Sequence, residues 1–352
     1  MARKNAYRLL GVIGLAVAGL CHPAISSGTV AAPQQCWAPG ALSAKPGEAT
    51  IRKGMRSAFV PVPRGTPRQP SASFQTIRGS IRRVKLPHGE KIVALTFDLC
   101  EQPYEITGYQ GDIVDYLREQ RIPATFFAGG KWMLTHTARA QQLMADPMFE
   151  LANHSWEHRN FRLLDDARLA REIDGAQLAY EQSYDALAKR RCVAPGGQGL
   201  AHNAAPPRLS LFRFPFGACN ARSLKAVNDR GLLAIQWDVS SADPWKALSA
   251  DRMTEYVVSR AKSGSIIIFH ANGRGWRTGE ALPRIISGLK AKGFRFATVS
   301  QLLAMPGAEP VVAQTCYDAK PGDSDRYDEL GRKLEVRYQE FYRAAGAEPN
   351  KR

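Results

Sequence analysis

From Lys91 to about Leu303 the sequence alternates short apolar runs with amphipathic segments of helix length. This alternation is typical of βα units, in which a helix carries the chain from one strand to the next parallel strand. We therefore expect an α/β fold built on a mainly parallel sheet, and the strand count and helix spacing favour a barrel over a flat sheet. In such a barrel, functional residues belong at the carboxyl ends of the strands.

The apolar runs that we expect to form strands are residues 92–97, 124–128, 149–152, 211–214, 232–239, 265–269 and 296–299. The helices expected between and after them are residues 112–120, 165–188, 221–230, 250–262 and 282–292.

By composition the chain divides into four segments: residues 1–31, a signal; residues 32–90, an extended lead rich in Pro, Gly and Arg; residues 91–303, the βα domain; and residues 304–352, a C-terminal extension. In the extension, apolar residues recur at helical spacing and predict a docked amphipathic helix over 325–343: Leu330, Leu334, Tyr338 and Phe341.

The first 31 residues have the pattern of a secretory signal. Arg3, Lys4 and Arg8 precede an apolar run over 9–20, and small residues follow where a signal peptidase could cut. The run is too short to cross a bilayer, which takes roughly 20 helical residues. We expect an exported protein, periplasmic or extracellular, with no transmembrane segment once the signal is removed.

The chain is strongly basic, with a formal net charge of +16 at pH 7. Such a charge favours electrostatic association with acidic polymers, including anionic envelope glycans. Nucleic acid is not the expected partner, because the basic clusters are not interleaved with aromatic stacking residues.

Six cysteines are present, and Cys21 would leave with the signal. The remaining five are an odd number in an oxidising compartment, so one free thiol is expected. Cys36 and Cys316 flank the βα domain and could form a bond that joins the two extensions. Cys100 and Cys219 are expected near the rim of the site, while the pairing of Cys192 stays open.

Two histidines, His154 and His158, are four residues apart, which places both imidazoles on one side of a helical turn. Both could bind one divalent cation and leave positions open for water and substrate. Zinc suits two imidazoles with one carboxylate, although Co, Ni and Mn also fit. Because Asp98 and His270 end two expected strands, the pattern favours a metal-assisted hydrolase.

Five segments together resemble the motifs of the polysaccharide deacetylase family, the group with the NodB homology domain that is also called carbohydrate esterase family 4. In chain order they are Lys91–Asp98, His154–His158, Arg213–Gly217, Trp237–Trp245 and Ile268–His270. The resemblance covers about residues 91–303. It implies a distorted (β/α)7 barrel and metal-dependent removal of N-acetyl or O-acetyl groups from an acetylated glycan.

The chemistry of amide hydrolysis gives these residues roles. Asp98 is the expected general base and His270 the acid, while Arg213 orients Asp98 and keeps it ionised. A backbone N–H near Phe216, together with the cation, would stabilise the oxyanion. The side chains expected to line the sugar-binding groove are aromatic: Phe216, Trp237 and Trp245.

The sequence departs from the family at two positions. Leu99 stands where the family has a second aspartate that binds the metal, and we expect Glu101, or else Asp98, to supply that ligand. Ser240 stands where the family has an acid that tunes the terminal histidine, a role that Asp238 or Asp243 could take. Two other functions stay open: a metal-independent hydrolase of another C–N bond, and a glycan-binding relative without catalysis.

Overall fold

The computed structural model describes residues 36–54, 56–70, 77–190, 205–316 and 325–347. The chain divides into two units, Met1–Val30 and Ala31–Arg352, and the description below concerns the second. The predicted signal over 1–31 and the predicted position of Cys192 lie outside the described residues.

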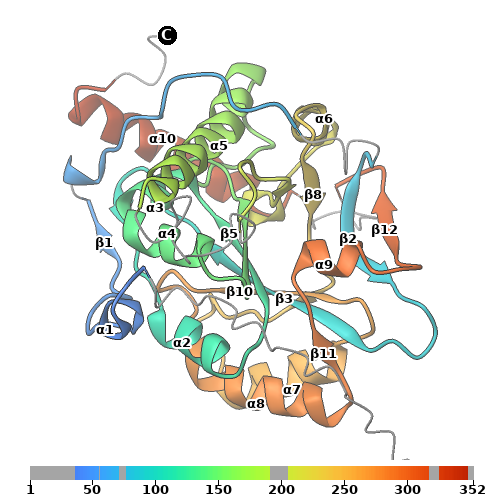
Figure 1. Cartoon of the computed structure of the whole chain (residues 1–352). Coiled ribbons are helices and arrows are strands. Elements are labelled where there is room, and N and C mark those ends of the chain that lie inside the picture. Colours follow the sequence, from blue (N-terminus) through green and yellow to red (C-terminus); the bar gives the residue numbers. More distant parts are fainter. Residues whose placement is uncertain (1–35, 55, 71–76, 191–204, 317–324, 348–352) are drawn as a thin grey trace, which may run out of the picture. The chain divides into compact units, whose positions relative to one another are not determined.

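Ten strands of the described residues form one sheet (Figure 1), in the order β12-β2-β8-β7-β6-β5-β3-β10-β9, with β11 paired to β3. All pairs are parallel except β12 with β2. The bounds are β2 Ser80–Lys85, β3 Ile92–Leu99, β5 Ala124–Ala128, β6 Phe149–Asn153, β7 Leu211–Phe212, β8 Leu233–Ile235, β9 Val239–Ser240, β10 Ile266–His270, β11 Arg295–Phe296 and β12 Glu309–Ala313. A separate two-stranded sheet pairs β1 Arg52–Lys53 with β4 Glu105–Ile106.

The sheet curls, and the segment after β8 crosses between its two sides. The Gln236 N–H donates to Ile81 O on β2, and two residues later the Asp238 N–H donates to Ile266 O on β10. The strand expected over 232–239 is therefore two short strands, because this chain leaves one side of the curl and joins the other. The predicted α/β barrel is confirmed in the form of a curled, parallel-rich half-barrel.

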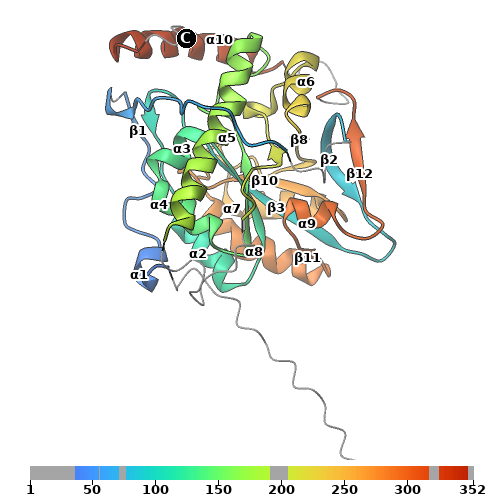
Figure 2. The ribbon, with the colours of Figure 1, turned by 45° about the horizontal axis from the view of Figure 1, so that its top comes forward.

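Helices accompany the strands in alternation, as predicted, and surround the curled sheet (Figures 1 and 2). Their bounds are α1 Pro39–Leu42, α2 Gly111–Glu119, α3 Gly130–Thr135, α4 Thr137–Met144, α5 Asp166–Ala188, α6 Ala221–Asp229, α7 Ala250–Arg260, α8 Thr278–Ala291, α9 Val299–Leu303 and α10 Asp328–Ala344, with 3-10 turns at Arg56–Ala58 and Pro215–Gly217. The strand expected over 296–299 ends at Phe296, because the Thr298 side chain caps α9 by accepting from the Gln301 N–H. The sequence did not predict α3 and α4.

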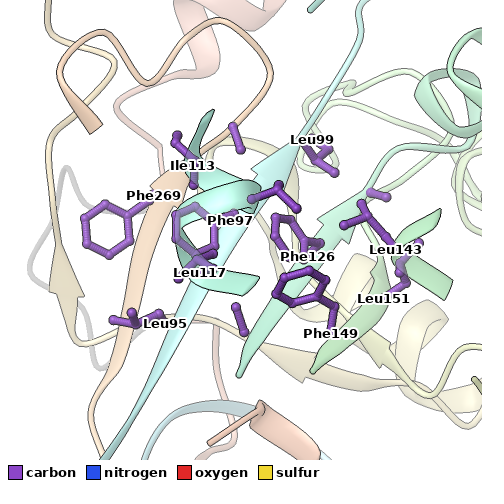
Figure 3. Packing of buried hydrophobic residues seen from close by; sticks show 14 of the residues in the cluster. Leu95, Phe97, Leu99, Ile113, Leu117, Phe126, Leu143, Phe149, Leu151 and Phe269 are labelled. Atoms are coloured by element: carbon purple, nitrogen blue, oxygen red, sulfur yellow. The ribbon is translucent and has the colours of Figure 1, made fainter. Parts of the chain in front are cut away.

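Strand β3 has two different faces. Its odd-numbered residues, Val93 to Leu99, belong to the large apolar cluster that includes Ile113 and Leu117 of α2 (Figure 3). The even-numbered Ile92 and Ala94 belong to a second cluster, shared with β2 and β8. Because side chains of a strand alternate between its faces, the second face continues toward Asp98 at the end of β3.

Both extensions contribute to this fold. β2 and β12 join the main sheet, although they lie outside the domain predicted over 91–303. The lead segment is attached through Arg139 of α4, whose guanidinium donates to both carboxylate oxygens of Glu48 at 2.6 and 2.7 Å. The predicted C-terminal helix is present as α10. No helix in the described part of the chain combines the length and apolar character needed to cross a bilayer.

Candidate functional site

Asp98 and Arg213 form a buried ion pair at the carboxyl end of β3. Arg213 Nη1 donates to Asp98 Oδ1 at 2.8 Å and to Thr96 Oγ1 at 2.8 Å. Burial raises the pKa of Asp98, but the charge of His154 when that ring is protonated and the permanent charge of Arg213 outweigh it, so the pKa lies below its ordinary value. Arg213 therefore orients Asp98 and keeps it ionised near neutral pH, as the sequence suggested.

The histidine pair lies in a loop after β6, not on a helical turn as expected. Ser155 and His158 both have positive φ, 69° and 61°, a conformation that is uncommon outside glycine. The loop is held by the Ser155 side chain, whose Oγ accepts from the His158 N–H at 3.0 Å. It brings the rings of His154 and His158 to 5.0 Å between centroids, so the expected proximity arises from a strained loop.

Among the described residues, one group of three or more His, Cys, Asp or Glu side chains is close enough together to hold a metal ion. It consists of Cys100, His154 and His158. The ligand atoms of Cys100, His154 and His158 lie within 4.8 Å of one another, and all three residues are buried. His154 Nδ1 lies 2.9 Å from Arg213 O. Because a carbonyl only accepts, Nδ1 carries the proton and Nε2 keeps its lone pair. Burial lowers the pKa of both imidazoles, so they are neutral, as metal ligands must be.

Glu101, expected as the third ligand, is not part of that group. Its carboxylate accepts from the Thr107 N–H at 2.9 Å and from Thr135 Oγ1 at 3.1 Å, and it lies 3.5 Å from Lys131 Nζ. Lys131 also donates to three carbonyl oxygens between residues 102 and 105. Glu101 thus holds the loop after β3 in place, a structural role that the sequence-based prediction did not include.

His270 ends β10 and is oriented by Asp243. His270 Nδ1 lies 2.9 Å from Asp243 Oδ1, and the His270 N–H donates to Asp243 Oδ2 at 2.7 Å. Burial alone lowers the pKa of His270, but the Asp243 carboxylate more than offsets this and the pKa is raised. Asp243 therefore takes the place of the acid missing at Ser240. Asp238, the other candidate, binds Ser265 Oγ at 2.8 Å instead.

A cavity of about 930 Å³ opens over these groups, within the range of small-ligand sites. Asp98, Cys100, His158 and His270 lie at its wall. Five aromatic residues and three arginines also line it: Phe216, Trp237, Trp245, Tyr256, Tyr327, Arg252, Arg274 and Arg326. The three predicted sugar-binding aromatics therefore share one cavity with the predicted base and acid.

The C-terminal extension contributes one wall of this cavity, which the sequence did not reveal. The Tyr327 ring lies 5.5 Å from the Phe216 ring, and Phe216 lies 4.5 Å from the ring of His158. A disulfide between Cys219 and Cys316 joins the segment before Tyr327 to the domain. The pairing of Cys36 with Cys316, left open by the sequence, is thus excluded. Cys36 is also disulfide-bonded, and Cys100 is the free cysteine of the described residues.

The polysaccharide deacetylase family model matches residues 85–206, which include β3 and the histidine loop. This region of the chain is similar to the polysaccharide deacetylases. The resemblance inferred from the five motifs is thereby confirmed, and so is the class of hydrolase to which they point.

Relatives of the deacetylase domain carry matching names. The chain is 29% identical over 223 residues to a peptidoglycan-N-acetylglucosamine deacetylase of Bacillus cereus, covering 62% of this chain and 91% of that protein. It is 28% identical over 182 residues to a chitooligosaccharide deacetylase of Rhizobium leguminosarum bv. phaseoli, covering 52% and 69%. A bifunctional xylanase/deacetylase of Pseudobutyrivibrio xylanivorans is 29% identical over 226 residues, 63% of this chain, and the match spans only 32% of that longer protein.

A solved structure confirms the fold. The crystal structure of a carbohydrate esterase family 4 pseudoenzyme from Bacillus anthracis superposes with a TM-score of 0.52 at 22% identity, covering 66% of this chain and 72% of that chain. At this identity the likeness concerns the fold alone, which is the curled sheet with its helices.

Sequence reasoning missed Cys100 as a candidate ligand, and the signal for it was in the strand pattern. Asp98 and Cys100 are two residues apart, which places their side chains on one face of an extended chain. The choice of Asp243 and the approach of Tyr327 depend on contacts between distant segments and had no such local signal.

Proposed function

We propose that this protein removes N-acetyl or O-acetyl groups from an acetylated glycan of the cell envelope or extracellular space, with the assistance of a divalent metal ion. The main observation behind the proposal is that Asp98 and His270, whose pKa values are shifted in opposite directions, line the same cavity. Asp98 is held ionised by Arg213, and His270 is held protonated more strongly than usual by Asp243. Because these two pKa values lie far apart, Asp98 is ionised and His270 is protonated over the same pH range, so one can act as base and the other as acid.

In this mechanism Asp98 takes a proton from the attacking water, and Arg213 keeps the carboxylate aimed and charged. His270 then donates its proton to the departing amine or alcohol, and Asp243 stabilises the imidazolium before transfer. His154, His158 and Cys100 would hold the metal, which polarises water and stabilises negative charge on the substrate oxygen when bound.

A glycan substrate is supported by the aromatic cavity and by the relatives named above. Ring faces such as those of Trp237 and Trp245 suit the apolar faces of sugars, while Arg252, Arg274 and Arg326 add positive charge at the wall. The signal-like residues 1–31 support export to the periplasm or beyond, where envelope glycans lie, and the basic charge supports association with anionic polymers.

The test is an acetyl-release assay on peptidoglycan, chitooligosaccharides and an acetylated exopolysaccharide, with mass analysis of the products. Wild type is expected to remove acetyl groups, and Asp98→Asn and His270→Ala are each expected to lose about a hundredfold or more in rate. Asp251→Asn and His88→Ala, both at exposed positions, are the matched controls and should act like wild type.

Thermal unfolding of each variant separates catalysis from folding. Folded wild type that releases no acetate from any of these polymers but binds them would favour the glycan-binding alternative. Activity that survives complete removal of metal would favour the metal-independent hydrolase.

A further inference from the structure

The candidate metal-binding residues differ from those that the sequence predicted, because the third is Cys100 and not Glu101 or Asp98. Where the family pattern calls for a carboxylate, Leu99 follows Asp98, and Leu99 is fully buried in the large apolar cluster (Figure 3). Its side chain belongs with those of Phe97 and Leu95, because alternate residues of a strand share a face. Residue 99 therefore points away from the histidine pair.

Cys100 returns to the face of Asp98. Its thiol lies at the cavity wall, and its sulfur is within 4.8 Å of a ligand nitrogen of both His154 and His158. Relative to the family pattern, the candidate third donor therefore lies one residue further along the chain and is sulfur, not oxygen.

Two buried ring nitrogens of this histidine pair have no hydrogen-bond partner among the described residues, although His154 Nε2 lies 3.4 Å from Asp98 Oδ2. The two atoms are His154 Nε2 and His158 Nδ1, and both are inaccessible to solvent. A buried polar atom without a partner loses its hydration without compensation, so such atoms are rare in folded proteins. A cation bound between the two rings and the sulfur would satisfy both nitrogen atoms.

Burial raises the pKa of the Cys100 thiol to about 12, so the thiol stays protonated until a cation displaces its proton. Two neighbours would stabilise the thiolate that forms on metal binding. Asn272 Nδ2 donates to Cys100 Sγ at 3.1 Å and to Cys100 O at 2.7 Å, which fixes the position of the sulfur. Arg274, anchored by Glu105 at 2.9 Å, adds a positive charge at the same cavity. A donor that orients the ligand atom and a nearby cation are the outer groups that stabilise metal thiolates.

We propose that Cys100, His154 and His158 form a thiolate–bis-imidazole site that selects a borderline-soft cation, Zn²⁺ or Co²⁺, over Mn²⁺ and Mg²⁺. The inference deepens the proposed function and rests on its metal dependence. Thiolate favours zinc and cobalt, whereas hard oxygen ligands favour manganese and magnesium. On binding, the thiol releases its proton to solvent and the sulfur donates an electron pair to the cation, and Asp98 stays free as the base.

The experiment titrates Co²⁺ into protein stripped of metal by a chelator and records the absorption spectrum. Wild type is expected to develop an intense near-ultraviolet band from thiolate-to-cobalt charge transfer, which oxygen and nitrogen ligands do not give. Cys100→Asp, the matched variant, restores a family-like carboxylate and should bind Co²⁺ without this band. Cys100→Ser should bind Zn²⁺ at least about tenfold more weakly than wild type in competition with a chromophoric chelator.

Wild type that binds Co²⁺ without the band, wild type that binds no Co²⁺, or Cys100→Ser with unchanged Zn²⁺ affinity would each overturn the proposal. The spectrum is measured on wild type, so a poorly folded variant does not remove the test. The two hypotheses also separate: the band without acetyl release refutes the proposed activity alone, and metal-dependent acetyl release without the band refutes the thiolate alone.

Discussion

The end of β3 divides three consecutive residues between two environments. Asp98 and Cys100 face the cavity, whereas Leu99 packs into the apolar cluster with Phe97 and its neighbours (Figure 3). Since the pleat alternates side chains strictly, a donor at residue 99 would have to be buried among apolar groups. The same constraint predicts that a polar residue is tolerated at 100 and not at 99.

Leu99→Asp is therefore expected to destabilise the protein by about 3 kcal/mol, because it buries a carboxylate without a partner. Leu99→Met keeps the volume and apolar character and should cost less than about 1.5 kcal/mol. Denaturant unfolding of the two variants compares these costs. Leu99→Asp with unchanged stability and tighter Zn²⁺ binding would show that residue 99 can reach the histidines.

Asp243→Asn is expected to move the alkaline limb of the pH–activity profile to lower pH. The Asp243 charge raises the pKa of His270, and His270 must be protonated to act as acid. Activity thus falls as pH rises through that pKa, and removing the charge makes it fall earlier.

The control for this variant is Asp238→Asn, whose carboxylate binds Ser265 and not His270. The pH dependence of kcat measured for both decides between them. An unchanged alkaline limb in folded Asp243→Asn would remove His270 as the acid or Asp243 as its partner.

At the scale of elements, helix α10 packs against the loop that carries the histidine pair. Arg159, one residue after His158, donates to Glu157 and to Glu335 of α10, both at 2.9 Å. Tyr342 of α10 donates to the Glu157 carboxylate. A helix outside the predicted βα domain thus holds buried charges beside His158, a proposed metal ligand, and it stabilises the strained loop by satisfying them.

Tyr342→Phe is expected to destabilise the protein by about 1–3 kcal/mol, because it removes a hydrogen bond to a buried carboxylate. Tyr338→Phe is the matched control on the same helix, since the Tyr338 hydroxyl is buried but has no hydrogen-bond partner among the described residues. Its removal should be neutral or slightly stabilising. Equal losses in thermal unfolding would show that ring packing alone holds α10.

At the scale of the whole described unit, both extensions return to the βα domain. β2 and β12 pair with each other at one end of the sheet order, and the Cys219–Cys316 disulfide holds the chain just beyond β12 against the segment after β7. Tyr327, which forms part of the cavity wall, comes shortly after Cys316 in the sequence. Formation of the site is therefore coupled to docking of a segment distant in sequence.

Cys316→Ser is expected to lower the free energy of unfolding by about 2–4 kcal/mol, because the bond closes a long loop, with a sequence separation of 97. Thermal unfolding with and without a reductant measures this effect. The reductant should lower the stability of wild type more than that of the variant, in which the disulfide of Cys36 remains. Identical responses would mean that the bond does not contribute.

The amino-acid sequence alone determined the parallel α/β architecture, most strands and helices, the α10 helix, and the grouping of Asp98, Arg213, His154, His158 and His270. These predictions succeeded because periodicity and motif order are local properties, and parallel strands bring their carboxyl ends to one edge of the sheet.

Only the tertiary structure decided which polar residues complete the site. It placed Cys100 and not Glu101 beside the histidine pair and Asp243 and not Asp238 beside His270, it paired Cys219 with Cys316, and it brought Tyr327 to the cavity. Each choice depends on where a side chain points once the sheet has curled and distant segments have docked. Such directions are set by packing and long-range hydrogen bonds, so neighbouring candidates in the sequence could not be told apart before the fold was known.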